Sequence, residues 1–323
     1  MQEQTHLNSL RENGFVVIPS LLNRTELTAL RDAAATATTL TRTGSWPYFR
    51  TVPKQFPPWP STPPPASEGG IWGVQHLLHP DMPGREVFAG VYFDERVLRV
   101  TEGLLGLDKG NEGGKGGEGE EKLVMELFNL LVAPEGRDFE LRWHRDDIPW
   151  DVTPEEEERL LASKSPGGRQ SHAQYNLALC EDHSLIVVPG SHRRVRSETE
   201  RNADPYESEL PGQLVVELQP GDAVFYDSNI LHRGVYRAKA EGGEETRLTL
   251  HGSIGLKEVG GDGGAAAGDG DQKVRATAVL QHGVGAWVHR EDAAFKDGGR
   301  AEKMRANLVA MGTGEGVGFS LQG

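Results

Sequence analysis

Between residues 123 and 256 the chain repeatedly alternates short apolar runs with turns that contain proline or glycine. Such runs are short enough for strands, and turn residues bound each of them. They stand at 123–132, 185–188, 214–218, 223–226 and 247–254. Many short strands with Pro-Gly turns, flanked by amino-terminal helices, predict a mainly β protein. The expected architecture is a jelly-roll barrel with flanking helices rather than a parallel sheet.

The remainder of the chain is expected to surround this β region. Apolar spacing and capping residues predict helices at 7–13, 25–37, 153–163 and 301–311, with short strands at 14–20 and 277–281. An aromatic, proline-rich stretch at 43–70 is interpreted as a lid over the site, and the low-complexity stretch at 109–121 as a surface hairpin. We expect one domain at 1–256, a glycine-rich loop at 257–272 and an extension at 273–323 packed on the same domain.

Composition limits the partners and the compartment. The formal net charge of −14 argues against binding to nucleic acid or to an anionic membrane surface. The single cysteine, Cys180, excludes an intramolecular disulfide and fits a reducing compartment. No apolar run approaches the length of a membrane span, and the amino terminus lacks a secretory core. We therefore expect a cytoplasmic protein that acts on a small molecule, with no protein partner implied.

The sequence Trp-His-Arg-Asp at residues 143–146 is a candidate half of a metal site. On a strand, His144 and Asp146 would point to the same side because they are two residues apart. Comparable patterns at 79–81 and 289–291 have poorer context, since the first contains a proline and the second lies in a polar run. Two imidazoles and one carboxylate leave one face of a metal open, as in non-haem Fe(II) oxygenases. The candidates for the second imidazole are His232, His192, His251, His172 and His183.

Four motifs in order resemble the phytanoyl-CoA dioxygenase family of Fe(II)/2-oxoglutarate oxygenases. They are Glu-Asn-Gly-Phe-Val-Val-Ile-Pro at 12–19, Trp-His-x-Asp at 143–146, Val-Pro-Gly-Ser-His at 188–192, and the run from Pro-Gly-Asp-Ala-Val-Phe-Tyr-Asp at 220–227 to Leu-His-Arg-Gly at 231–234. The resemblance covers about residues 7 to 256, and the final stretch is similar to extensions of fungal members. It implies a double-stranded β-helix of the cupin type, with Fe(II) held by His144, Asp146 and His232. The role of His192 in the family's turn looks structural.

The resemblance also implies an arginine that binds the distal carboxylate of 2-oxoglutarate. In the family this arginine opens the strand after the distal histidine, and Arg247 fits better than Arg233 or Arg237 because it shares a strand face with polar residues. The alternative is a surface arginine paired with Glu244 or Glu245. Asn176 and Gln174 face one way on their strand and are candidates for binding co-substrate or substrate. Polar residues in such positions often only hydrogen-bond to each other.

The implied reaction uses Fe(II), 2-oxoglutarate and dioxygen, releases succinate and carbon dioxide, and is assayed with ascorbate as reductant. Related halogenases replace the carboxylate with a small residue, so Asp146 favours hydroxylation of a C–H bond as the default outcome. A fungal metabolite is the expected substrate class, and Trp72, Gln75 and Trp150 are candidates for lining its site. The alternatives are a catalytically silent jelly-roll binding protein and a zinc-type hydrolase that uses the same triad.

Overall fold

The structure is a computed structural model and describes residues 2–53, 59–107, 122–164, 172–239, 246–257, 268–295 and 299–314. Its largest element is an antiparallel sheet of seven strands in the order β1-β9-β6-β11-β4-β3-β2. These strands are β1 (Phe15–Ile18), β2 (Phe49–Thr51), β3 (Ile71–Val74), β4 (Leu123–Val132), β6 (His172–Ala178), β9 (Ala223–Tyr226) and β11 (Leu248–Leu256).

A second antiparallel sheet of four strands has the order β5-β10-β7-β8. It contains β5 (Phe139–Glu140), β7 (Leu185–Val188), β8 (Leu214–Val215) and β10 (Leu231–Tyr236). The chain from β4 to β11 passes back and forth between the two sheets, which is the topology of a jelly roll. The expected mainly β double-stranded β-helix is therefore confirmed. Among the described residues, backbone hydrogen bonds do not join the two sheets into a closed barrel.

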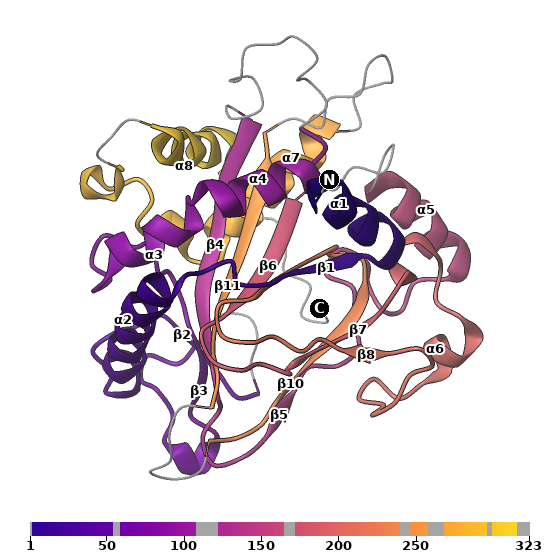
Figure 1. The fold of residues 1–323 in the computed structure, drawn as a ribbon, viewed down its shortest axis with the longest axis horizontal. Coiled ribbons are helices and arrows are strands. Elements are labelled where there is room, and N and C mark those ends of the chain that lie inside the picture. Colours follow the sequence, from indigo (N-terminus) through magenta and orange to yellow (C-terminus); the bar gives the residue numbers. More distant parts are fainter. Residues whose placement is uncertain are drawn as a thin grey trace.

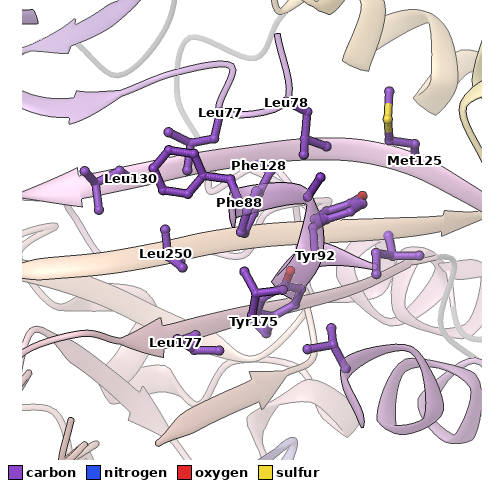
Figure 2. Packing of buried hydrophobic residues seen from close by; sticks show 14 of the residues in the cluster. Leu77, Leu78, Phe88, Tyr92, Met125, Phe128, Leu130, Tyr175, Leu177 and Leu250 are labelled. Carbon is purple, nitrogen blue, oxygen red and sulfur yellow. The ribbon is translucent and has the colours of Figure 1, made fainter. Parts of the chain in front are cut away.

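Strand alternation gives the seven-stranded sheet one apolar face and one polar face. Leu250 on β11 stands opposite Leu130 on β4 and Leu177 on β6, and Figure 2 shows all three in one layer of buried side chains. The next residue, His251, stands opposite Asn129 and Asn176, so these polar side chains point to the other face. That polar face turns toward the four-stranded sheet, and the candidate site lies there.

Helices cover the apolar face of the large sheet. Four different helices contribute side chains to the same buried cluster as the leucines of the sheet. These side chains are Leu30, Phe88, Leu98 and Leu308. Figure 1 shows α2, α3, α4 and α8 on this side, with the four-stranded sheet on the other. None of the helices in the described part of the chain is long and apolar enough to cross a membrane. The helices are α1 (Gln2–Asn13), α2 (Arg24–Arg42), α3 (Arg85–Tyr92), α4 (Glu95–Leu104), α5 (Pro154–Lys164), α6 (Glu198–Asn202), α7 (Gly268–Gln281) and α8 (Arg300–Met311).

Two sequence expectations about local structure are wrong. Residues 277–281 were expected to form a strand, but they are the last part of helix α7. Arg275 of the same helix pairs with the buried Glu126 of β4. The stretch at 43–70 is not a lid throughout, because it contains strand β2 and its Trp46 and Phe49 are core residues. The proline-rich composition hid a three-residue strand. Residues 54–58 of that stretch, and the predicted surface hairpin at 109–121, lie outside the described residues.

The amino-terminal motif packs against the turn at 188–192. The amide of Gly190 donates to the carbonyl of Asn13 over 2.8 Å, and the ring of His192 lies 3.2 Å from the carbonyl of Arg11. Gly14 has a φ of 81°, and a β-carbon there would come within 2.5 Å of the His192 ring. Only glycine fits both conditions. His192 is thus occupied with holding the two motifs together, as its expected structural role requires.

Candidate active site

His144, Asp146 and His232 come together beside strand β10. Nε2 of His144 lies 3.5 Å from Oδ1 of Asp146, and Nε2 of His232 lies 3.8 Å from the same oxygen. One ligand atom from each residue lies within 4.8 Å of the others. Two atoms that bind one metal ion through bonds of about 2.1 Å can be at most about 4.2 Å apart. Both distances to Oδ1 satisfy this limit.

The backbone around the two imidazoles fixes which nitrogen faces the centre of the group. Nδ1 of His144 lies 2.7 Å from the carbonyl oxygen of Arg142, and Nδ1 of His232 lies 2.8 Å from that of Ile230. A carbonyl oxygen can only accept a hydrogen bond, so each Nδ1 carries the proton. Each Nε2 therefore presents a lone pair toward Asp146. This is the tautomer that a metal ligand requires.

His144 and Asp146 do not lie on a regular strand, contrary to the sequence expectation. Strand β5 ends at Glu140, and His144 forms only an isolated bridge with His232, with both amide-to-carbonyl distances at 3.0 Å. The amide of Asp146 then donates to the carbonyl of Ser228 over 2.9 Å. The three side chains converge because this segment is bound to the chain around β10, and not because of strand alternation alone.

Gln174 holds the carboxylate from the neighbouring sheet. Its Nε2 donates to Oδ2 of Asp146 over 2.6 Å, which leaves Oδ1 directed at the two imidazoles. Burial by itself would raise the pKa of Asp146, but His232, His144 and Gln174 hold it well below its ordinary value. Burial lowers the pKa of His232 to about 4. At neutral pH Asp146 is therefore a carboxylate beside the neutral imidazole of His232. The Asp146 side chain is 31% exposed, whereas those of His144 and His232 are 5% and 7% exposed.

Arg247 lies immediately before β11 and is only 5% exposed, so the surface alternative is wrong. Its Nε lies 3.3 Å from Oδ2 of Asp182, and its guanidinium carbon lies 4.1 Å from the centre of the Tyr236 ring. Its Nη1 is buried and has no hydrogen-bond partner among the described residues. The residues Glu244 and Glu245 of the alternative lie outside the described part of the chain. Arg237, in contrast, is exposed and pairs with Asp138.

The other candidates fall into two groups. Asn176 accepts a hydrogen bond from Nδ1 of His251 over 2.8 Å, so this pair lies on the polar face beside Gln174 but outside the triad. His183 is at the surface, where it pairs with Glu181, and His172 is buried on β6. Among the described residues, His144, Asp146 and His232 are the group whose ligand atoms converge for a metal.

A buried charge cluster next to the site was missed from the sequence. Arg145 lies between His144 and Asp146 in the sequence. Its guanidinium donates to Glu157 of α5 over 3.0 Å and also to the carbonyl oxygens of Ser191 and Asn229. Arg196 and Arg201 pair with the same carboxylate. The sequence predicted a helix at 153–163 but gave no sign that Glu157 within it is completely buried. The four arginines between 193 and 201, in a segment with only two acids, Glu198 and Glu200, were the available signal.

The donor set fits one divalent metal ion, with two imidazole nitrogens and one carboxylate oxygen on one side of it. A jelly roll with this group defines the class of mononuclear non-haem iron oxygenases. The family model for phytanoyl-CoA dioxygenase (PhyH) matches residues 10–235, and the chain belongs to this family. The protein is accordingly a dioxygenase that depends on Fe(II) and 2-oxoglutarate. No curated protein sequence matches the chain.

Solved structures resemble the fold at low sequence identity. EctD from S. alaskensis with 2-oxoglutarate and 5-hydroxyectoine is 17% identical, with a TM-score of 0.51, and the match covers 78% of this chain and 75% of that one. AviO1 from Streptomyces viridochromogenes Tue57 is 18% identical, with a TM-score of 0.49 and coverage of 82% and 97%. HygX from Streptomyces hygroscopicus, with nickel, 2-oxoglutarate and hygromycin B bound, is 17% identical, with a TM-score of 0.48 and coverage of 78% and 86%. The likeness to EctD bears on the fold alone.

Proposed function

We propose that the enzyme hydroxylates a C–H bond of a small molecule, with His144, Asp146 and His232 as the iron ligands. The observation that carries this proposal is the convergence of three ligand atoms within 4.8 Å, each oriented by a hydrogen bond to its other polar atom. Asp146 keeps a carboxylate at the position where a small residue would leave room for a halide. We place the enzyme in the cytoplasm, with a fungal metabolite as substrate and without protein or nucleic-acid partners.

We assign the distal carboxylate of 2-oxoglutarate to Arg247. Asp182 and the Tyr236 ring hold the guanidinium from two sides, while Nη1 has no partner among the described residues. A buried N–H without a partner is costly, and a carboxylate would satisfy it with a charge-assisted hydrogen bond. Thr249 also donates to Asp182, so this acid is fixed in place as a support for Arg247.

The residues around the metal position would act by orientation. The carbonyls of Arg142 and Ile230 keep both imidazoles in the tautomer that binds metal, and Gln174 keeps one oxygen of Asp146 from turning away. When bound, iron together with 2-oxoglutarate and dioxygen supplies the oxidising power that breaks a substrate C–H bond, with release of succinate and carbon dioxide. Asn176 and His251 form a hydrogen bond with each other on the polar face of the large sheet, so we assign both side chains to the wall of the site.

The test is to measure iron content and succinate formation with Fe(II), ascorbate and 2-oxoglutarate. The His232→Ala variant should lose tightly held iron and succinate formation together, because one of three ligands is removed. His183→Ala is the matched control, since that histidine is exposed and outside the group. Unchanged iron stoichiometry in His232→Ala would contradict the assignment. A silent binding protein would bind 2-oxoglutarate without making succinate, and a zinc-type hydrolase would retain zinc and make none.

A further inference from the structure

Arg50 on strand β2 is a buried cation for which the described structure provides no counter-charge. Five arginines are buried in the described part of the chain, and four of them pair with a carboxylate: Arg145, Arg196, Arg233 and Arg247. Arg50 is 8% exposed, and no described carboxylate pairs with it. Its Nε has no hydrogen-bond partner among the described residues. An unpaired buried charge is expensive, so its presence requires a reason other than stability.

The charge of Arg50 persists at neutral pH. Burial lowers the pKa of Arg50 to about 10, which leaves the guanidinium protonated at pH 7. Arg50 stands opposite Gly73 on β3, and a β-carbon at Gly73 would make only an ordinary van der Waals contact with Cδ of Arg50, at 3.4 Å. The guanidinium carbon lies 5.3 Å from the centre of the Trp72 ring, a position typical of a cation–π contact.

Two further polar side chains without full partners lie on the same face. Gln75 follows β3 two residues after Gly73, is fully buried, and has no partner for either atom of its amide among the described residues. Asn129 on β4 is also fully buried, and its Nδ2 has no partner there, while its Oδ1 accepts from the amide of His76 over 3.1 Å. Native proteins rarely bury such groups unsatisfied. The unmet groups are mainly N–H donors on the face that carries Arg50, which is the chemistry that receives an anion.

This cluster lies on the face that carries the candidate metal group. On the neighbouring strands, Asn129 stands opposite His251, and His251 stands opposite Asn176. Two residues from Asn176 on β6, Gln174 donates a hydrogen bond to the carboxylate of Asp146. Arg50 stands opposite Gly73, and Gly73 stands opposite Leu131, two residues from Asn129 on β4, so Arg50 and His251 lie on the same face of the sheet. A ligand held at Arg50 would therefore extend along the polar face toward the metal position.

Arg50 is distinct from the arginine that we assign to the co-substrate. Trp72 and Tyr236 stack with ring centres 5.5 Å apart, and Arg50 contacts the first ring while Arg247 contacts the second. Arg247 has its own supporting acid, Asp182, and Arg50 has none among the described residues. Arg50 on the Trp72 ring and Arg247 on the Tyr236 ring therefore provide two separate binding positions for anionic groups.

We propose that Arg50, with the amides of Gln75 and Asn129, binds a carboxylate group of the substrate, so that the enzyme oxidises small carboxylic acids. The proposal rests on the proposed function, since it concerns the substrate of that same site. The planar fork of arginine suits the two oxygens of a carboxylate. Hydrogen-bond donors that lose their partner give strong discrimination, so the neutral amide of the same acid should bind much more weakly.

The experiment uses the full-length enzyme loaded with Fe(II) and 2-oxoglutarate under nitrogen, so that the co-substrate position is filled. A panel of alkyl and aryl carboxylic acids and their carboxamides is titrated by calorimetry. We expect acids of suitable shape to bind at least tenfold more tightly than their amides. This preference should disappear in Arg50→Gln and be largely kept in Arg50→Lys. The control is Arg237→Gln, which removes an exposed arginine and should change nothing.

Several outcomes would overturn the proposal. One is that the wild-type enzyme binds no acid of the panel more tightly than its carboxamide. Another is that the preference for acids persists in Arg50→Gln; either result contradicts the proposal. A tenfold loss of 2-oxoglutarate affinity in Arg50→Gln would assign Arg50 to the co-substrate instead. If Arg50→Gln and Arg50→Met both fail to fold while Arg237→Gln folds, Arg50 is structural and the proposal fails. Failure of the proposed function would appear separately, as absence of succinate from the wild-type enzyme, because the titrations need no turnover.

Discussion

Replacing Glu157 with glutamine should strongly destabilise the protein. Its Oε1 lies 3.0 Å from Nε of Arg145 and 3.1 Å from Nε of Arg196, and its Oε2 pairs with Arg201. The side chains of Arg145 and Arg196 are each only 2% exposed, so water cannot replace the lost charge. Glutamine would also turn an NH2 group toward arginine N–H donors. Removing one member of a buried ion pair costs about 3–5 kcal/mol.

This loss is large compared with the stability of about 5–15 kcal/mol that is usual for a folded domain. Urea unfolding followed by tryptophan fluorescence should therefore show a much lower midpoint at an unchanged slope. The control is Glu158→Gln on the same helix, where the side chain is exposed and the change should stay within about 0.5 kcal/mol. Equal stabilities of the two variants would refute the conclusion that Glu157 neutralises the arginine cluster.

Two further predictions concern the co-substrate and pH. Arg247→Ala should raise the apparent constant for 2-oxoglutarate at least tenfold, since charge-assisted hydrogen bonds contribute about 1.5–3 kcal/mol. Arg237→Ala should change this constant little, and the reverse order would show that the wrong arginine was assigned. Burial lowers the pKa values of His76, His251 and His282 to about 3. Below pH 6.5 the unfolded chain binds protons that the folded protein accepts only near pH 3, so stability should fall as the pH drops through this window. A urea midpoint that is the same at pH 7.5 and pH 5 would contradict this.

The sequence alone predicted the class of fold and the metal group because both depend on local patterns. Strand lengths and Pro-Gly turns predicted the jelly roll, and the structure confirms it. The motif order selected His144, Asp146 and His232, which the structure brings together. The pattern of polar and apolar residues after Arg247 correctly predicted which face of β11 is apolar, because side chains alternate along a strand.

Other features depended on contacts between segments far apart in the sequence. A strand was expected at 143–146, but an isolated bridge to His232 holds this segment instead. Local periodicity gave no sign that Glu157 is buried, because its burial results from three arginines on other segments. The short strand β2 was hidden in a proline-rich stretch, since its three residues are stabilised by pairing with β3.

The isolation of Arg50 could be recognised only in the tertiary structure. A sequence shows that an arginine is present, but not whether a carboxylate faces it. Every other buried arginine among the described residues has one. Pairing of β2 with β3, and of β3 with β4, places Arg50 on the polar face together with Gln75 and Asn129. The sequence thus determined which chemistry this chain can support, because ligand types and strand patterns are local. The tertiary structure decided which charges are paired, because pairing depends on the packing of distant segments.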